Sequence, residues 1–349
     1  MTLNSAAVTG IGSVTPFGPL AGLIPPSAVE PESITAWPTA GLRRAFLVKP
    51  FRPASAVPGL KTRRVDRLSA WAMVASSLAI QDAGIDLSQV DRSRVAVVFG
   101  TGFGCAELTE AFYQSAAVNG WSGTDPSPFP EGLANAPASH VALLHGLRGP
   151  NITVGTTGFA GESALTQAAS LLRHGQADLA IVLAGDTLTR AVYEWYEVAG
   201  LLSPACFNSE AMPQSAGFVP SEGVVAVVLE PTGRREVRHY ARLSSGRWAP
   251  GGKALETIRQ MLGGSVPSLT ICAGNGAPCA ASSTAGLARE ISGPDAVVVP
   301  ARAVAAGLAD AGALFHLILA LSSRPPSGLV LLLATSGDHG FAAILLDLP

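Results

Sequence analysis

Charged and aromatic side chains are scarce in this 349-residue sequence: they make up 14% and 6% of it, and the formal net charge is −2. Such a balance lacks the lysine and arginine excess typical of proteins that bind nucleic acid or anionic membranes. No uninterrupted apolar run reaches about 18 residues, so we expect no transmembrane helix. The segment Met1–Pro16 has no basic stretch followed by an apolar one, which predicts no signal peptide and a cytoplasmic protein.

Cysteine is also rare, with Cys105, Cys206, Cys272 and Cys279 as the four residues of this type. None forms a C-x-x-C pair and no histidine cluster accompanies them, which argues against a zinc site. Free, partly buried thiols in a reducing cytoplasm are the expected state. The sequence therefore predicts neither a metal nor a cofactor.

What the sequence does contain is a series of short apolar strands that alternate with helical patterns. The expected strands are 6–12, 94–99, 151–154, 177–184, 223–230, 268–272, 296–299, 328–334 and 341–346. The expected helices are 106–117, 159–174, 254–262, 311–321 and one that begins after Asp66 as N-cap and stops at Gly84. This alternation predicts an α/β protein with a mixed or largely parallel sheet between helices.

Two halves with a similar strand–helix order indicate an internally duplicated fold. The basic stretch Arg234–Arg238 is interpreted as the crossover between them, which divides the chain into residues 1–235 and 236–349. Residues 17–60 are rich in proline and glycine and are expected to be irregular.

Several segments resemble, in the same order, the signatures of the β-ketoacyl synthase family. They are residues 8–18 (VTGIGSVTPFG), 63–85, 147–154 (LRGPNITV), 175–186 (GQADLAIVLAGD) and 217–230 (GFVPSEGVVAVVLE). The resemblance implies a thiolase-like fold of two αβαβα-type halves with mixed five-stranded sheets. It further implies a dimer formed through the first half, and here the second half is shortened.

The catalytic residues of that family are the part that this sequence does not match. Its cysteine lies in a motif like T-A-C-x-S-G, and the corresponding stretch Thr156–Gly161 places Gly158 at the nucleophile position. Gly274 stands at the position of the first histidine, and Ala301 and Ala306 stand at those of the lysine and the second histidine. The resemblance thus implies that no residue of this chain carries out condensation.

Such subunits resemble the chain-length factors of type II polyketide synthases. This likeness implies a heterodimer with a cysteine-containing ketosynthase. The two subunits would form an acyltransferase complex, and acyl carrier protein would deliver its acyl groups. Familiar members carry glutamine where this chain has Gly158. That departure and the short second half favour a polyene or other reduced product over an aromatic one.

By the same resemblance, the helix after the Gly100 turn crosses the dimer interface and lines the far end of the partner's tunnel. The candidate lining residues are Phe103, Cys105, Leu108, Phe112 and Phe129. Large side chains at these positions would shorten the cavity and small ones would lengthen it.

Two other functions remain open. The first is a thioester hydrolase or acyltransferase of the same fold, which would use Asp338 and His339, the one adjacent acid–imidazole pair in the sequence. The second is a degenerate homodimer that would only bind acyl chains. His140, His145, His174, His239 and His316 match no catalytic position of the family, and most of them are expected to be capping or surface residues. The glycines at positions 100, 102 and 104 lack the rest of a dinucleotide fingerprint and are interpreted as a turn.

Overall fold

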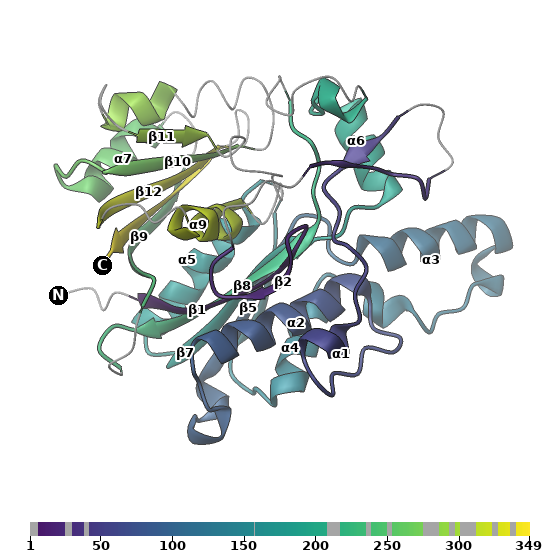
Figure 1. The fold of residues 1–349 in the computed structure, drawn as a ribbon. Coiled ribbons are helices and arrows are strands. Elements are labelled where there is room, and N and C mark those ends of the chain that lie inside the picture. Colours follow the sequence, from purple (N-terminus) through teal and green to yellow (C-terminus); the bar gives the residue numbers. More distant parts are fainter. Residues whose placement is uncertain are drawn as a thin grey trace.

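The computed structural model describes residues 6–24, 30–37, 42–156, 158–207, 217–234, 239–249, 253–274, 286–292, 297–300, 312–322, 327–335 and 340–349. Within these residues the strands form one large sheet, with helices packed on both of its faces (Figure 1). A separate ribbon of β3 (Glu32–Ser33) and β4 (Arg44–Ala45) lies in the region expected to be irregular, as does the short helix α1 (Pro53–Ala56).

The first half contributes five strands in the spatial order β1-β8-β7-β5-β6. Their bounds are β1 Ala6–Thr15, β5 Val95–Thr101, β6 Asn151–Gly155, β7 Leu179–Asp186 and β8 Gly223–Pro231. β8 runs antiparallel to both of its neighbours, whereas β5 is parallel to β7 and β6. A short strand β2 (Gly18–Ala21) folds back on β1.

The second half repeats this arrangement as β9-β13-β12-β10-β11. Its strands are β9 Ala241–Ala249, β10 Leu269–Gly274, β11 Val297–Pro300, β12 Gly328–Thr335 and β13 Phe341–Leu348. β13 is antiparallel to β9 and β12, and β10 is parallel to β12 and β11, as in the first half. The expected pair of mixed five-stranded sheets is therefore confirmed. The boundary predicted between residues 235 and 236 lies outside the described residues.

The two sheets are joined edge to edge by a short antiparallel contact. Residues 6–8 of β1 pair with residues 241–243 of β9. Strand β9 was not expected from the sequence, because the polar residues of 241–249 alternate too weakly to mark a strand.

Helices form three layers around the sheets. α5 (Ala160–Arg173) and α9 (Gly312–Ser322) lie between the two sheets and share one core with both, whereas α2 (Arg67–Asp82) and α4 (Ala136–His145) cover the outer face of the first sheet. α7 (Ala254–Leu262) covers the outer face of the second. Along β5, Ala96 and Val98 face the inner core while Val97 and Phe99 face α2, as the two-residue period of a strand requires.

Two glycines in β1 set how closely α2 packs on the first sheet. A Cβ atom at Gly10 or Gly12 would lie 2.2 Å from the carbonyl oxygen of Ala79 or Ala75. The helix itself begins as predicted: Asp66 accepts a hydrogen bond from Leu68 N at 2.8 Å, and Gly84 follows the helix with a φ of 61°.

Candidate functional site

The position predicted to match the family's nucleophile lies where α5 begins. Gly158 has a φ of 86° and directly precedes Phe159, the N-cap of α5. Phe159 is buried against Ala334 and Ala342 of the second sheet, so this helix start lies where the two halves meet. Backbone N–H groups at such an N-terminus favour a negative charge. Gly158 has no side chain, so it cannot place a negatively charged group at this helix start.

The start of α5 also packs tightly on the end of β5. A Cβ atom at Gly100 would lie 2.2 Å from the carbonyl oxygen of Ala160. Thr156 N donates to Thr101 O at 3.2 Å, which ties the end of β6 to the same strand. Strand end and helix start thus meet as a backbone-to-backbone contact that only glycine at position 100 permits.

The other positions matched to catalytic residues are only partly described. Gly274 ends β10 and pairs with Thr335 of β12. Ala301, Ala306, Asp338 and His339 lie outside the described residues. Their assignment therefore stays a prediction.

The cysteines that the structure describes do not offer a replacement nucleophile. Cys105, Cys206 and Cys272 are buried free thiols. Burial raises the pKa of Cys206 to about 11 and that of Cys272 to about 12, and it raises the pKa of Cys105 still further. Because the reactive species is the thiolate, none of these three thiols is activated at neutral pH. Cys279 lies outside the described residues.

The five predicted lining residues do not share one environment. Cys105 is the N-cap residue of α3 (Ala106–Asn119) and its thiol is buried 4.0 Å from Ser69 Oγ. Phe103 packs edge-on against Trp195 and Tyr196 of α6 (Arg190–Val198), with ring centroids 5.7 Å apart in each pair. Leu108, by contrast, is half-buried on α3 itself.

Phe112 and Phe129 meet on a projecting feature that the sequence did not reveal. We call residues 106–133 the arm: α3, the turns 121–123 and 129–132, and the chain between them, which extend from the body of the molecule (Figure 1). Phe112 contacts Phe129 with ring centroids 5.5 Å apart, and Tyr113 and Trp121 lie beside it.

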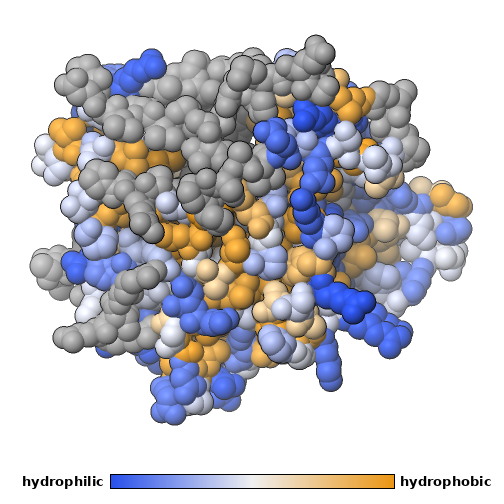
Figure 2. All heavy atoms as spheres, in the orientation of Figure 1, coloured by the Kyte–Doolittle hydropathy of each residue, from blue (hydrophilic) through white to orange (hydrophobic). Residues whose placement is uncertain are grey.

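Much of the arm's aromatic surface faces solvent. Trp121 is 71% exposed, Tyr113 56% and Phe129 49%. Figure 2 shows apolar surface at the end of α3, on the right of the view. An exposed aromatic cluster of this kind is typical of a surface that another protein covers.

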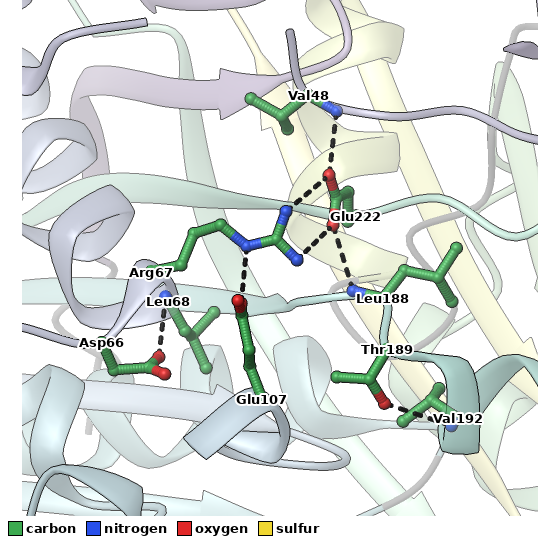
Figure 3. Close-up of polar contacts among 9 residues, drawn as sticks. All are labelled: Val48, Asp66, Arg67, Leu68, Glu107, Leu188, Thr189, Val192 and Glu222. Atoms are coloured by element: carbon green, nitrogen blue, oxygen red, sulfur yellow. Dashed lines mark hydrogen bonds and ion pairs between the residues drawn. The ribbon is translucent and has the colours of Figure 1, made fainter. Parts of the chain in front are cut away.

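A buried carboxylate organises the base of the arm (Figure 3). Glu222 accepts hydrogen bonds from Val48 N at 3.2 Å and Leu188 N at 3.1 Å, and Arg67 Nη2 lies 3.1 Å from its Oε2. Arg67 Nε also donates to Glu107 Oε2 at 2.9 Å, in the first turn of α3. Burial raises the pKa of Glu222, and the Arg67 guanidinium opposes that rise. This network was not predicted from the sequence.

One histidine has a partner in a neighbouring helix. His145, at the end of α4, is half-buried and packs against α2, with Nε2 3.2 Å from Ser76 Oγ. Burial, with a smaller effect of Arg92, lowers the pKa of His145 to about 4. His140 and His174 are accessible as expected: the first pairs with Glu131 Oε2 at 2.7 Å, and Nδ1 of the second lies 2.8 Å from Ser170 O.

Comparison with known proteins decides the family. Residues 23–234, more than half of the chain, match the model of the β-ketoacyl synthase N-terminal domain. The chain belongs to the β-ketoacyl synthase family. Among curated relatives, 3-oxoacyl-[acyl-carrier-protein] synthase 2 of Vibrio cholerae is 29% identical over 66% of this chain, and nodulation protein E of Rhizobium leguminosarum bv. trifolii is 30% identical over 64%. The chain spans 58% and 57% of the lengths of these two relatives.

Solved structures extend the likeness to the whole chain and confirm the thiolase-like fold. The ishigamide ketosynthase/chain length factor superposes with a TM-score of 0.85 at 16% identity, covering 99% of both chains. A β-ketoacyl synthase from Burkholderia phymatum gives 0.81 at 15% identity, also over 99% of both chains. A type II polyketide synthase ketosynthase, in complex with its acyl-carrier protein and bound to the hexaketide, gives 0.74 at 16% identity over 99% of each chain.

The described residues lack both a membrane-spanning helix and a cluster of metal-binding side chains. No helix among the described residues is long and apolar enough to cross a membrane. In that same part of the chain, His, Cys, Asp and Glu side chains nowhere gather in a group able to hold a metal ion.

Proposed function

We propose that this chain is a non-catalytic subunit of a ketosynthase complex, a chain-length factor that pairs with a cysteine-bearing ketosynthase. The observation that carries the proposal is Gly158, a residue without a side chain that directly precedes the N-cap of α5 at the position predicted for the family's nucleophile. Its φ of 86° belongs to the left-handed region that glycine favours. The backbone here suits glycine, so a cysteine would be strained at this position.

Two surface features support a partner for this chain. β6 is the last strand of its sheet, pairs with β5 alone among the described strands, and is partly exposed along its length. An open edge of this kind can pair with another chain. The exposed aromatic cluster of the arm offers the apolar contact that a stable interface needs.

The proposed partner and carrier protein follow from the structural relatives. One relative is described as a ketosynthase/chain length factor, and another as a ketosynthase in complex with its acyl-carrier protein. For this chain we propose the same association: a heterodimer that shapes the elongation tunnel and receives acyl groups from carrier protein. A polyene or other reduced chain is the proposed product class.

The test is co-expression with a ketosynthase from the same gene neighbourhood, followed by purification through a tag on one subunit. We expect a one-to-one complex that makes product from malonyl carrier protein. Changing the partner's cysteine to alanine should abolish product, while Phe112→Ala in this chain should lengthen it, because removing a ring enlarges the tunnel.

Two results would contradict the proposal. A chain that purifies alone as a homodimer and ignores the ketosynthase would favour acyl binding without a partner. Thioester turnover by the purified chain, lost on His339→Ala, would favour the hydrolase or acyltransferase alternative.

A further inference from the structure

The glycine turn after β5 binds a carboxylate of its own chain. Asp186, the last residue of β7, accepts hydrogen bonds from Gly102 N at 3.1 Å, Phe103 N at 2.9 Å and Thr101 Oγ1 at 2.5 Å. Gly104 N donates in turn to Thr101 Oγ1 at 2.8 Å. Successive backbone N–H groups that converge in this way form a nest for an anion. Here the anion is the Asp186 side chain.

The charge of Asp186 fits this role. Burial raises the pKa of Asp186 to about 6, and the hydrogen bonds from the turn act against that rise. The half-buried carboxylate is therefore ionised at neutral pH, which makes the donated bonds charge-assisted and strong. Strong bonds to three consecutive residues hold the turn in one conformation.

The turn 101–104 directly precedes the arm and fixes the position of the first residues that lead into it. Phe103, whose N–H Asp186 accepts, packs between Trp195 and Tyr196 of α6. Gly104 has a φ of 63° and is followed at once by Cys105 and α3. The hydrogen bonds of the Asp186 carboxylate thus fix the residues that determine the direction of α3 relative to the sheet.

A second set of contacts links α3 to Leu188, two residues beyond Asp186, through hydrogen bonds and ion pairs. Leu188 N donates to Glu222, Glu222 pairs with Arg67, and Arg67 pairs with Glu107 on the first turn of α3. The short segment 186–188 therefore fixes α3 both through the turn and through the ion-pair network (Figure 3).

We propose that Asp186 is a positioning residue for product length: it holds the turn 101–104 and so places the arm against the ketosynthase partner. The inference rests on the proposed function, because it concerns how this chain would shape the shared tunnel. Its physical part, the holding of the turn, concerns this chain alone.

The first experiment measures amide hydrogen exchange in the purified chain. Asp186→Asn removes the negative charge and puts an amide N–H₂ group in place of Oδ2, which accepts from Gly102 N; that bond is lost, and the bonds that Oδ1 accepts from Thr101 Oγ1 and Phe103 N are no longer charge-assisted. We expect the protection of the amides of residues 102–104 to fall about tenfold or more. Asp178→Asn is the matched control: Asp178 precedes the same strand β7 and pairs with Arg94 at 2.7 Å, at the end away from the turn. Unchanged protection at residues 102–104 in Asp186→Asn overturns the proposal.

A second pair of variants covers the case in which Asp186→Asn does not fold. Thr101→Val removes the hydroxyl that donates to Asp186 and accepts from Gly104, and Thr101→Ser keeps it. Loss of protection in Thr101→Val that Thr101→Ser restores supports the anchor, and equal exchange in both variants overturns it.

The second experiment measures product lengths of the reconstituted pair. We expect Asp186→Asn to shift or broaden the distribution by at least one two-carbon unit, with wild-type lengths for Asp178→Asn. A yield that falls in proportion to folded protein, at unchanged lengths, overturns the positioning role. If the wild-type pair makes no product, the proposed function fails, and the exchange experiment alone decides whether Asp186 holds the arm.

Discussion

Arg67 and Glu222 lie 155 residues apart in the chain, and their side chains form an ion pair at 3.1 Å. The carboxylate is buried, whereas the guanidinium is partly exposed and stacks over Trp71 at 4.9 Å. The pair connects α2 to the sheet and, through Glu107, to the arm.

Removal of the guanidinium should destabilise the fold, because it leaves a buried carboxylate without its cation. For Arg67→Met we expect the free energy of unfolding to fall by about 2 kcal/mol, measured by urea denaturation. The control is Glu107→Gln, which breaks the more exposed of the two ion pairs and should cost less than about 0.5 kcal/mol. Equal losses in both variants would contradict the central position of Arg67.

His145 should make stability depend on pH. Its pKa is lowered to about 4 in the folded chain from an ordinary 6.5, so the unfolded chain binds the proton first as pH falls. The stabilisation is complete above pH 6.5 and is lost as pH falls towards 4, by up to about 3 kcal/mol. Urea denaturation of His145→Gln between these pH values should show a flatter profile than wild type. The same substitution at the exposed His174 should keep the wild-type slope.

A cysteine at position 158 should not create a condensing enzyme. The φ of 86° strains any residue with a side chain, at about 1–3 kcal/mol, and the other matched positions hold no histidine or lysine. Gly158→Cys alone is therefore expected to be less stable and to form no product from malonyl carrier protein. Gly158→Ala separates the effect of strain from that of the thiol. Product formation by Gly158→Cys would refute the assignment of Gly274, Ala301 and Ala306.

Trp121 should be an anchor of the proposed interface. For Trp121→Ser we expect the affinity for the ketosynthase to fall tenfold or more, measured by titration calorimetry, because exposed aromatics dominate interface energies. Val266 is equally accessible, at 65% exposed, but lies in the second half of the chain. Val266→Ser should leave the affinity unchanged. Comparable losses for the two variants would place the interface elsewhere.

The sequence predicts the strands and helices of this fold where one periodicity dominates. β5, β7 and β8 are continuous apolar runs buried on both faces, and α2 has a capping aspartate and a stop glycine. α4 was missed because it begins Ala136-Pro137, and a proline in a short polar context is typical of a loop as well as of a first helical turn. α6 was missed as well, since five of its nine residues are aromatic or valine, types of lower helix propensity.

The candidate site divides in the same way. The start of α5 was placed by a local motif, so the sequence indicates Gly158 without knowledge of the fold. The carboxylates Asp186 and Glu222 were not identified, because their partners come from segments far apart in the chain. Their signal in the sequence is a single acidic residue at the edge of an apolar strand, which becomes informative only once the strands are in place.

Strand β1 has a consequence for how the chain folds during synthesis. All ten of its residues are buried, and its principal partner β8 begins at Gly223. At a typical rate of translation, about 10–40 s pass before β8 follows β1 out of the ribosome. During that time β2 is the one strand among the described residues before β8 that pairs with β1. The growing polypeptide thus exposes an uncharged ten-residue segment that is buried in the folded chain, and chaperone supply during translation should limit its yield.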